Sequence, residues 1–244
     1  MIPAPLSKQN RILGILTAPV YARLLSDLEL VSLSPGQGIY EPDIHITHLY
    51  FPIDCIVARL CELKSGAAFQ TSVTGNEGMV GISYLLGCER IHGRAVALSG
   101  GNAFRIKAPL LKKEFESGGE LQRLLLRFIE ALIVQMEHIA VGARHDSIEQ
   151  RLCYFLLMNL DRLAGNELFI THEQVSIFLG TRRESITQAA QRLAITGAIR
   201  YRRGHLRVIN RQELENRAGD SYAVVSREYQ YLQQSPSSSV SLRL

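Results

Sequence analysis

Residues 171–190 read Thr-His-Glu-Gln-Val-Ser-Ile-Phe-Leu-Gly-Thr-Arg-Arg-Glu-Ser-Ile-Thr-Gln-Ala-Ala and hold two short helical patterns. Three apolar residues share one face of the first pattern, with i, i+3, i+4 spacing: Val175, Phe178 and Leu179. Two pairs have capping-box spacing and predict a helix start at each threonine: Thr171–Gln174 and Thr181–Glu184. Gly180 lies between the patterns, where a residue that accepts positive φ ends one helix and lets the next begin. The segment therefore predicts a helix-turn-helix.

The outward face of the second helix begins with Arg183 and Glu184 and continues with Gln188 one turn later. A guanidinium such as that of Arg183 can form a bidentate pair with guanine O6/N7, and the Glu184 carboxylate can accept from cytosine N4. Gln188 lies within reach of an adenine or a phosphate. Because the second helix of such a motif presents its N-terminal side chains to the major groove, this face predicts sequence-specific contact with double-stranded DNA.

A basic β-hairpin follows the two helices. Residues 198–202 and 206–209 predict two strands around Arg203-Gly204-His205, which is the layout of a wing. Residues 171–219 contain nine arginines and four glutamates, a net charge of +5, whereas the whole chain has +4. Positive charge is thus concentrated where phosphate contacts are needed. The alternative is a solvated charged face on a winged helix that serves as a protein-interaction module.

Composition indicates a globular protein. The chain has 244 residues, of which 46% are hydrophobic and 20% charged, enough for two modest domains or one large one. It has no apolar stretch of 18 residues and no signal-peptide pattern, so we expect a cytoplasmic protein without membrane association. The four cysteines are scattered, which indicates buried or free thiols. We expect no cofactor and no metal, since Asp43, His45 and His48 are too isolated to form a metal site. Motifs of common enzyme classes are absent, so we expect no catalytic residues.

The first half of the chain has helical patterns followed by strand-like patterns. Residues 10–16 and 19–28 have helical patterns, and short alternating runs separated by turn signals follow over residues 29–108. The candidate strands are residues 48–51, 55–62, 68–73, 95–99 and 102–107. Evenly spaced short strands favour a sandwich or barrel, here a β-roll.

A second helical region covers residues 109–145 and is interrupted at Ser117-Gly118-Gly119. Its longer part, residues 120–144, carries residues at the 3, 4, 3, 4, 3 spacing of a heptad seam: Leu125, Phe128, Leu132, Gln135, Ile139 and Gly142. We interpret the seam as the interface of a parallel homodimer, because two helix-turn-helix units must be held roughly 34–36 Å apart to read half-sites one turn apart. The alternative is a single helix that packs on its own domain. A capping box at Ser147–Gln150 opens another helix, which extends to about Leu163.

The order of these parts over residues 10–218 resembles the Crp/Fnr superfamily of bacterial transcription regulators. The most specific similarity runs from Ile170 to Thr187 and continues with Leu193, Gly197, Ile199 and the wing. The expected fold is α+β: a β-roll sensor domain (10–108), a dimerisation helix (109–145), a winged helix-turn-helix domain (146–219) and a C-terminal tail (220–244). The low-complexity run at 234–241 is expected to be disordered. The resemblance implies a homodimer on a palindromic DNA site, with RNA polymerase as a further partner.

The resemblance also implies roles for single residues. In that family the positions of Arg183, Glu184 and Gln188 face base edges. Positions near DNA phosphates match Thr171, His172, Arg182 and Ser185, together with the wing turn that includes Arg203 and His205. Gln188 stands where cyclic-AMP-type members commonly have arginine, so the resemblance does not fix the preferred half-site.

The sensor half departs further from the family pattern. Cyclic-nucleotide-binding members carry a Gly-Glu pair for the ribose and an Arg-Ser/Thr-Ala run for the cyclic phosphate. Here Gly78-Met79-Val80-Gly81-Ile82 and Ile91-His92-Gly93 occupy these places, so we do not expect a cyclic nucleotide to bind. An unidentified effector is the remaining expectation, in a pocket near Gly81, Ile82, Arg90 and Arg94. An N-terminal cysteine cluster for an iron-sulfur sensor is absent.

Overall fold

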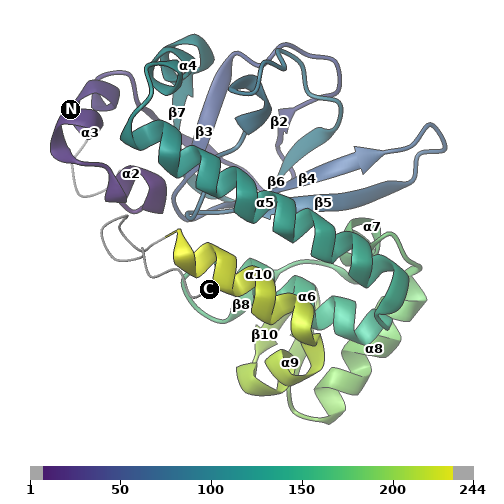
Figure 1. Cartoon of the computed structure of the whole chain (residues 1–244). Coiled ribbons are helices and arrows are strands. Elements are labelled where there is room, and N and C mark those ends of the chain that lie inside the picture. Colours follow the sequence, from purple (N-terminus) through teal and green to yellow (C-terminus); the bar gives the residue numbers. More distant parts are fainter. Residues whose placement is uncertain (1–7, 233–244) are drawn as a thin grey trace, which may run out of the picture.

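The structure is a computed structural model that describes residues 8–232. The N-terminal part begins with helices α2 (Arg11–Ile15) and α3 (Ala18–Leu25). Seven strands follow: β1 (Glu29–Leu33), β2 (Gly38–Tyr40), β3 (His48–Pro52), β4 (Ile56–Glu62), β5 (Ala68–Thr74), β6 (Arg94–Ser99) and β7 (Gly101–Lys107). A short 3₁₀ turn, η1 (Ile82–Tyr84), lies between β5 and β6. Figure 1 shows this part above the C-terminal domain, with a long helix between them.

The strands form two antiparallel sheets, with the orders β1-β7-β3 and β2-β6-β4-β5. Their inward residues are fully buried, among them Leu49 and Phe51 on β3, Ile56 on β4 and Phe104 on β7. This arrangement confirms the predicted β-roll. Strands β1 and β2 were not predicted, because β1 is mostly exposed and β2 has only three residues.

Helices α4 (Ala108–Glu116) and α5 (Glu120–His145) follow the β-roll, and α5 packs against β5. Leu125, Phe128 and Gln135 are fully buried within the protomer. A Cβ atom on Gly78 would overlap the Phe128 ring, so this stripe is pressed against the β-roll. Gly142 is also buried, and Leu132 and Ile139 are half-buried. Four of the six predicted seam residues therefore have no surface left for a partner helix, because this part of the stripe packs on its own domain. Leu132 and Ile139 keep part of their surface, and a seam through them stays a prediction.

The C-terminal domain contains the elements of a winged helix-turn-helix: α6 (Ile148–Leu160), β8 (Glu167–Phe169), α7 (His172–Leu179), α8 (Arg183–Ile195), β9 (Ile199–Arg202), β10 (His205–Val208) and α9 (Arg211–Ala218). The capping boxes predicted at Ser147 and Thr171 are both present. The one predicted at Thr181 is wrong, because Arg182 is the N-cap of α8 and makes no side-chain cap. Strand β8, which was not predicted, adds a third strand beside the wing in the order β8-β10-β9.

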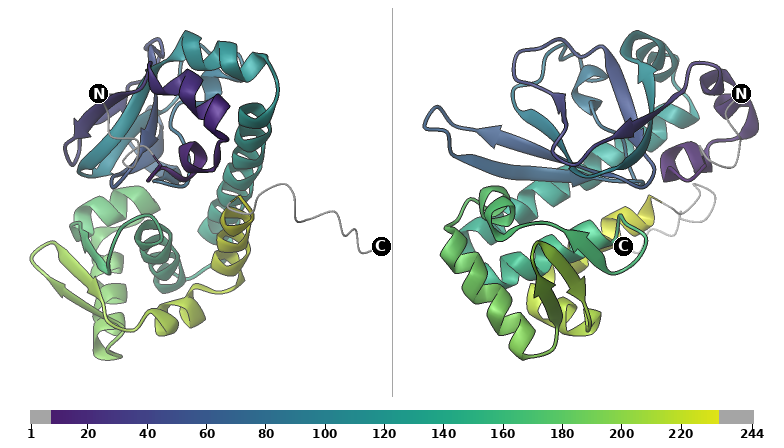
Figure 2. Two further views of the ribbon diagram at one scale, coloured as in Figure 1. Left: turned by 90° about the vertical axis from the view of Figure 1, so that its left-hand side faces the viewer. Right: turned by 180° about the vertical axis from the view of Figure 1, so that it is seen from behind.

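The predicted C-terminal tail is a helix in its first half. Residues 220–231 form α10 (Asp220–Tyr231), which packs along α5 and also contacts α6 (Figure 2). Three buried residues at i, i+3 and i+7 spacing give α10 an inner face: Tyr222, Val225 and Tyr229. The low-complexity run at 234–241 lies outside the described residues. No helix within residues 8–232 is long and apolar enough to cross a membrane.

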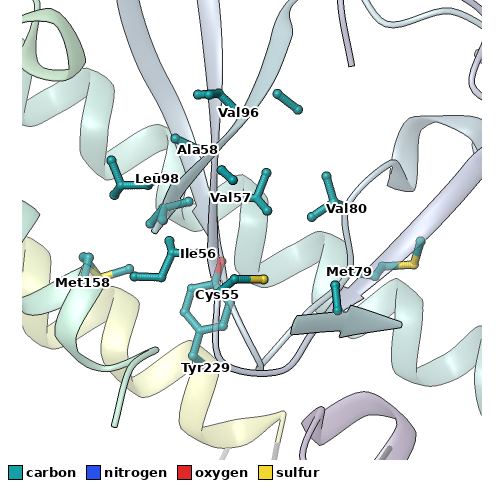
Figure 3. Packing of buried hydrophobic residues seen from close by; sticks show 14 of the residues in the cluster. Cys55, Ile56, Val57, Ala58, Met79, Val80, Val96, Leu98, Met158 and Tyr229 are labelled. Carbon is teal, nitrogen blue, oxygen red and sulfur yellow. The ribbon is translucent and has the colours of Figure 1, made fainter. Parts of the chain in front are cut away.

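The β-roll and the C-terminal domain are joined by a buried polar junction. Arg162, at the end of α6, donates from Nε to Glu77 Oε1 over 2.7 Å, and the two side chains are only 3% and 4% exposed. The Glu77 carboxylate also accepts from the Gly75 N–H. Gln135 of α5 binds the backbone of Val73 and donates to the Tyr229 hydroxyl. Figure 3 shows Tyr229 and Met158 in the same buried cluster as Ile56 of the β-roll. The winged domain is thereby held in one orientation.

Candidate nucleic-acid interface

The turn between α7 and α8 is built around Gly180. This residue adopts φ 57° and ψ 45°, and its N–H donates to the carbonyls of Ser176 and Ile177, which ends α7. A Cβ atom here would lie 2.9 Å from the Phe69 ring, so the turn also touches β5 of the β-roll. Both the positive φ and the close approach require glycine. The predicted role of Gly180 is thus confirmed, and the turn fixes where α8 begins.

The three residues predicted to face base edges lie together at the start of α8. Arg183, Glu184 and Gln188 are exposed and, with Thr187, line one shallow hollow of about 250 Å³. The Thr187 hydroxyl donates to the Arg183 carbonyl. Arg183 Nε lies 4.0 Å from Glu173 Oε2, and both side chains are mostly exposed. Guanidinium, carboxylate and amide groups therefore share one surface, where each can reach a base edge.

Four of the predicted phosphate-contacting residues have side chains that reach solvent. Thr171 and Arg182 are exposed at the N-termini of α7 and α8, and Ser185 is half-buried on the first turn of α8. Helix N-termini favour anions because their first N–H groups lack intrahelical partners. Arg203 is exposed in the wing turn, where it adopts φ 49° before Gly204 at φ 79°. Such a two-residue turn projects the arginine from the tip of the wing.

The two histidines that were predicted to lie near phosphates make contacts within the protein. The His172 ring stacks on Tyr201 at 4.1 Å, its Nδ1 lies 3.0 Å from the Thr187 hydroxyl, and its Nε2 is buried. Burial lowers the pKa of His172, and Arg183 lowers it further. His205 stacks on Phe169 and places Nε2 3.0 Å from Glu167 Oε2. His172 therefore links α8, through Thr187, to the wing, through Tyr201, and contact of either histidine with a phosphate stays a prediction.

An ion-pair cluster that the sequence analysis missed holds α8 in place. Glu149 of α6 accepts from Arg192 Nε at 2.7 Å and from Arg217 Nη1 at 2.5 Å. Arg192 lies on α8 and Arg217 on α9, so one carboxylate joins three helices. The pKa of Glu149 is lowered, mainly by the hydrogen bond from Arg192. Sequence spacing could not reveal this cluster, because Glu149 lies 43 positions before Arg192.

The residues predicted to line an effector pocket in the β-roll contact other residues of the protein. A Cβ atom on Gly81 would overlap the Tyr40 hydroxyl, which itself donates to the His48 carbonyl. Ile82 begins the 3₁₀ turn and is half-buried. Arg90 donates to the Asp43 carbonyl, and Arg94 pairs with Glu41 at 3.2 Å. Side chains thus fill the position beside Gly81, and neither arginine is available to a buried phosphate.

The described residues contain no group of three or more His, Cys, Asp or Glu side chains that could hold a metal ion. Cys55 and Cys153 are buried, and burial raises the pKa of each thiol to about 12. Both cysteines are therefore thiols that pack as small apolar residues.

Comparison with known proteins agrees with this geometry. Residues 150–217 match the family model of the Crp-like helix-turn-helix domain. FixK2 from Bradyrhizobium japonicum has a similar structure, with a TM-score of 0.67 and 19% identity over 78% of this chain and 96% of that one. Two Crp/Fnr-type transcriptional regulators from Thermus thermophilus align with TM-scores of 0.66 and 0.61. They are 15% and 20% identical to this chain, over 78% and 79% of it and 97% and 100% of their own lengths. No curated protein sequence matches the chain significantly.

The matched domain and the shared architecture define the helix-turn-helix region and the fold of the chain. The chain carries a Crp-like helix-turn-helix domain and has the fold of Crp/Fnr-type regulators.

Proposed function

We propose that this protein binds a palindromic DNA site as a homodimer and regulates transcription there. The observation that carries the proposal is the hollow of Arg183, Glu184 and Gln188 at the exposed start of α8. Arg183 and Glu184 read base edges, and Gln188 extends the contact by one turn. Thr171, Arg182, Ser185 and the wing turn at Arg203 contact phosphates and fix the register.

A different stripe of α5 supports the homodimer. Exposed or half-buried apolar residues recur at 3, 4, 3, 4, 3 spacing, one position later than the buried stripe: Leu126, Ile129, Ile133, Met136, Ala140 and Ala143. Leu126, Ile133 and Met136 are 48%, 42% and 40% exposed in the protomer. A continuous apolar stripe with heptad spacing is the surface that a parallel two-helix coiled coil buries. We propose that this stripe, and not the buried one, is the dimer seam.

The proposed regulator acts in the cytoplasm without catalysis of its own. RNA polymerase is the expected partner for activation, whereas repression needs only occupancy of the site. The β-roll positions the dimer in either case.

The test is selection of bound fragments from a genomic DNA library with purified full-length protein. The variant Arg183→Ala/Glu184→Ala removes one positive and one negative group from the hollow. The matched control Arg23→Ala/Glu114→Ala removes a partly exposed ion pair of the N-terminal half, with the same change in charge. We expect the wild type and the control to enrich a two-fold symmetric motif with half-sites about one helical turn apart.

The Arg183→Ala/Glu184→Ala variant should lose this enrichment while its weak, salt-dependent binding to DNA of any sequence persists. Loss of one good base contact corresponds to about 1–3 kcal/mol of discrimination. Equal enrichment by this variant and the control would overturn the assignment of the base-reading residues. Binding that does not weaken with salt would favour a protein-interaction module.

A further inference from the structure

A cavity of about 710 Å³ lies at the junction of three parts of the chain. The β-roll side contributes Arg11 and Glu77, the end of α6 contributes Arg162, α9 contributes Arg211, and α10 contributes Arg227 and Tyr229. The ribbon shows how these parts meet, because α10 runs beside α5 and ends next to α2 (Figures 1 and 2). The volume is in the range of small-molecule sites in proteins.

The lining of this cavity carries more positive than negative charge. Its four arginines face three carboxylates, which belong to Glu77, Asp161 and Glu215. All three carboxylates are in use: Glu77 pairs with Arg162, while Asp161 and Glu215 lie 2.5 and 2.8 Å from Arg211. Arg11 and Arg227 form no ion pair within residues 8–232. Two guanidinium groups thus remain for an anion.

Arg162 gives a second and independent indication of a ligand. Its side chain is only 3% exposed, stacks on the Tyr229 ring at 4.7 Å, and donates to Glu77 from Nε and to the Met158 carbonyl from Nη1. Its Nη2 is buried and donates to no acceptor among the described residues. Buried guanidinium donors are almost always satisfied, so an acceptor close to Nη2 would stabilise Arg162, which lines the cavity beside Tyr229.

We propose that the cavity binds a small polyanion that carries phosphate or carboxylate groups. The planar fork of arginine suits both groups, which accept two parallel hydrogen bonds. Arg162 supplies the buried donor, and Arg11 and Arg227 supply the charge at the mouth. A bound ligand would touch the β-roll, the winged domain and α10 together. Because all three parts line the cavity, a bound ligand would strengthen their attachment to one another. The site lies outside the β-roll interior, and its existence does not depend on DNA binding.

The test is isothermal titration calorimetry of the full-length protein with pyrophosphate and, separately, with citrate, at a fixed ionic strength of about 0.15 M. The pocket variant is Arg11→Gln/Arg227→Gln. The matched control is Lys64→Gln/Lys113→Gln, which removes two exposed positive charges that do not line the cavity. Thermal unfolding checks that both variants fold, and no DNA is present.

We expect the wild type and the control to bind at least one probe equally well. The pocket variant should bind it at least about tenfold more weakly, because each lost charge-assisted contact is worth about that factor. Binding of pyrophosphate alone assigns a phosphate ligand, and binding of citrate alone a carboxylate ligand. Binding of neither probe, equal affinity in the pocket variant, or loss of binding in the control would each overturn the site. DNA binding by the same variants, measured separately, keeps this outcome apart from the proposed regulator function.

Discussion

At the scale of single residues, Gly180 meets two requirements at once. Its positive φ of 57° disfavours any side chain, and the Phe69 ring fills the space of a Cβ atom. The first requirement follows from the place of Gly180 between two helical patterns. The second could not be predicted, because Phe69 lies in another domain, more than a hundred residues earlier in the chain. The turn is therefore also an interdomain contact.

Replacement of Gly180 by alanine should lower the free energy of unfolding by about 2 kcal/mol, from backbone strain and the clash with Phe69. The control is Gly66→Ala, since Gly66 has φ 82° and a Cβ atom added there would meet no other atom within 4 Å. That change should lower the free energy of unfolding by only about 1 kcal/mol, from backbone strain alone. Urea denaturation measures both values. Equal losses would mean that the Phe69 contact carries no energy.

The charge of Glu149 should contribute stability that depends on pH. Its folded pKa is lowered, mainly by Arg192, so the contribution is present above the unfolded pKa of about 4.5 and is lost as pH falls through the folded value. We expect Glu149→Gln to lower the free energy of unfolding at pH 7 by about 1–2 kcal/mol. The difference from wild type should shrink in acid. The control is Glu116→Gln, which breaks the 3.8 Å pair of Glu116 with Lys112 and should change the stability very little at any pH. Denaturation of both variants and of the wild type at several pH values measures the difference.

At the scale of elements, α5 shows what a sequence period can and cannot determine. Two stripes run along this helix with the same spacing, one through Leu125 and one through Leu126, and both are largely apolar. Periodicity predicts the helix but cannot say which stripe meets the β-roll, because that depends on strand β5 and on Gly78. The polar Gln135 looked like a seam residue, yet its amide binds the backbone of Val73.

In other elements too, features formed by residues close in sequence could be predicted, whereas features that depend on tertiary contacts could not. Both confirmed capping boxes, at Ser147 and Thr171, are formed by residues three apart, so the sequence contains all of their parts. Helix α10 was missed because its inner face is completed only by α5 and α6. The three residues proposed to read base edges are exposed, as the sequence predicts. The stacked positions of His172 and His205 could not be predicted, because their stacking partners come from other elements.

The exposed stripe of α5 should determine the oligomeric state. Ile133→Glu places a carboxylate at a seam position of both helices, where like charges would meet without water. We expect at least a tenfold weaker dimer by sedimentation equilibrium, since about 1.4 kcal/mol corresponds to this factor. Leu110→Glu on α4, where Leu110 is 39% exposed, should leave the dimer intact. An unchanged dimer in Ile133→Glu would refute the proposed seam.

At the scale of the whole molecule, the two domains are joined by a charge pair that neither could bury alone. Glu77 comes from the loop after β5 and Arg162 from the end of α6, 85 positions apart. A Cβ atom on Gly75 would lie 2.6 Å from the Arg162 side chain, so the loop closes directly over the arginine. The pair therefore sets one geometry for the domains, and breaking it should loosen their attachment.

Replacement of Glu77 by glutamine leaves the Arg162 charge buried without its counter-ion, which should lower the free energy of unfolding by about 3–5 kcal/mol. The double variant Glu77→Gln/Arg162→Met removes the charge as well and should recover most of that loss, because a paired charge gains little over an apolar side chain. The ion pair of Arg23 and Glu114, whose arginine is 55% exposed, gives the control: Glu114→Gln should lower the free energy of unfolding by no more than about 1 kcal/mol. Urea denaturation followed by circular dichroism measures all three. If Glu77→Gln and the double variant are equally destabilised, the uncompensated charge is not the cause, and packing at the junction is what holds the domains together.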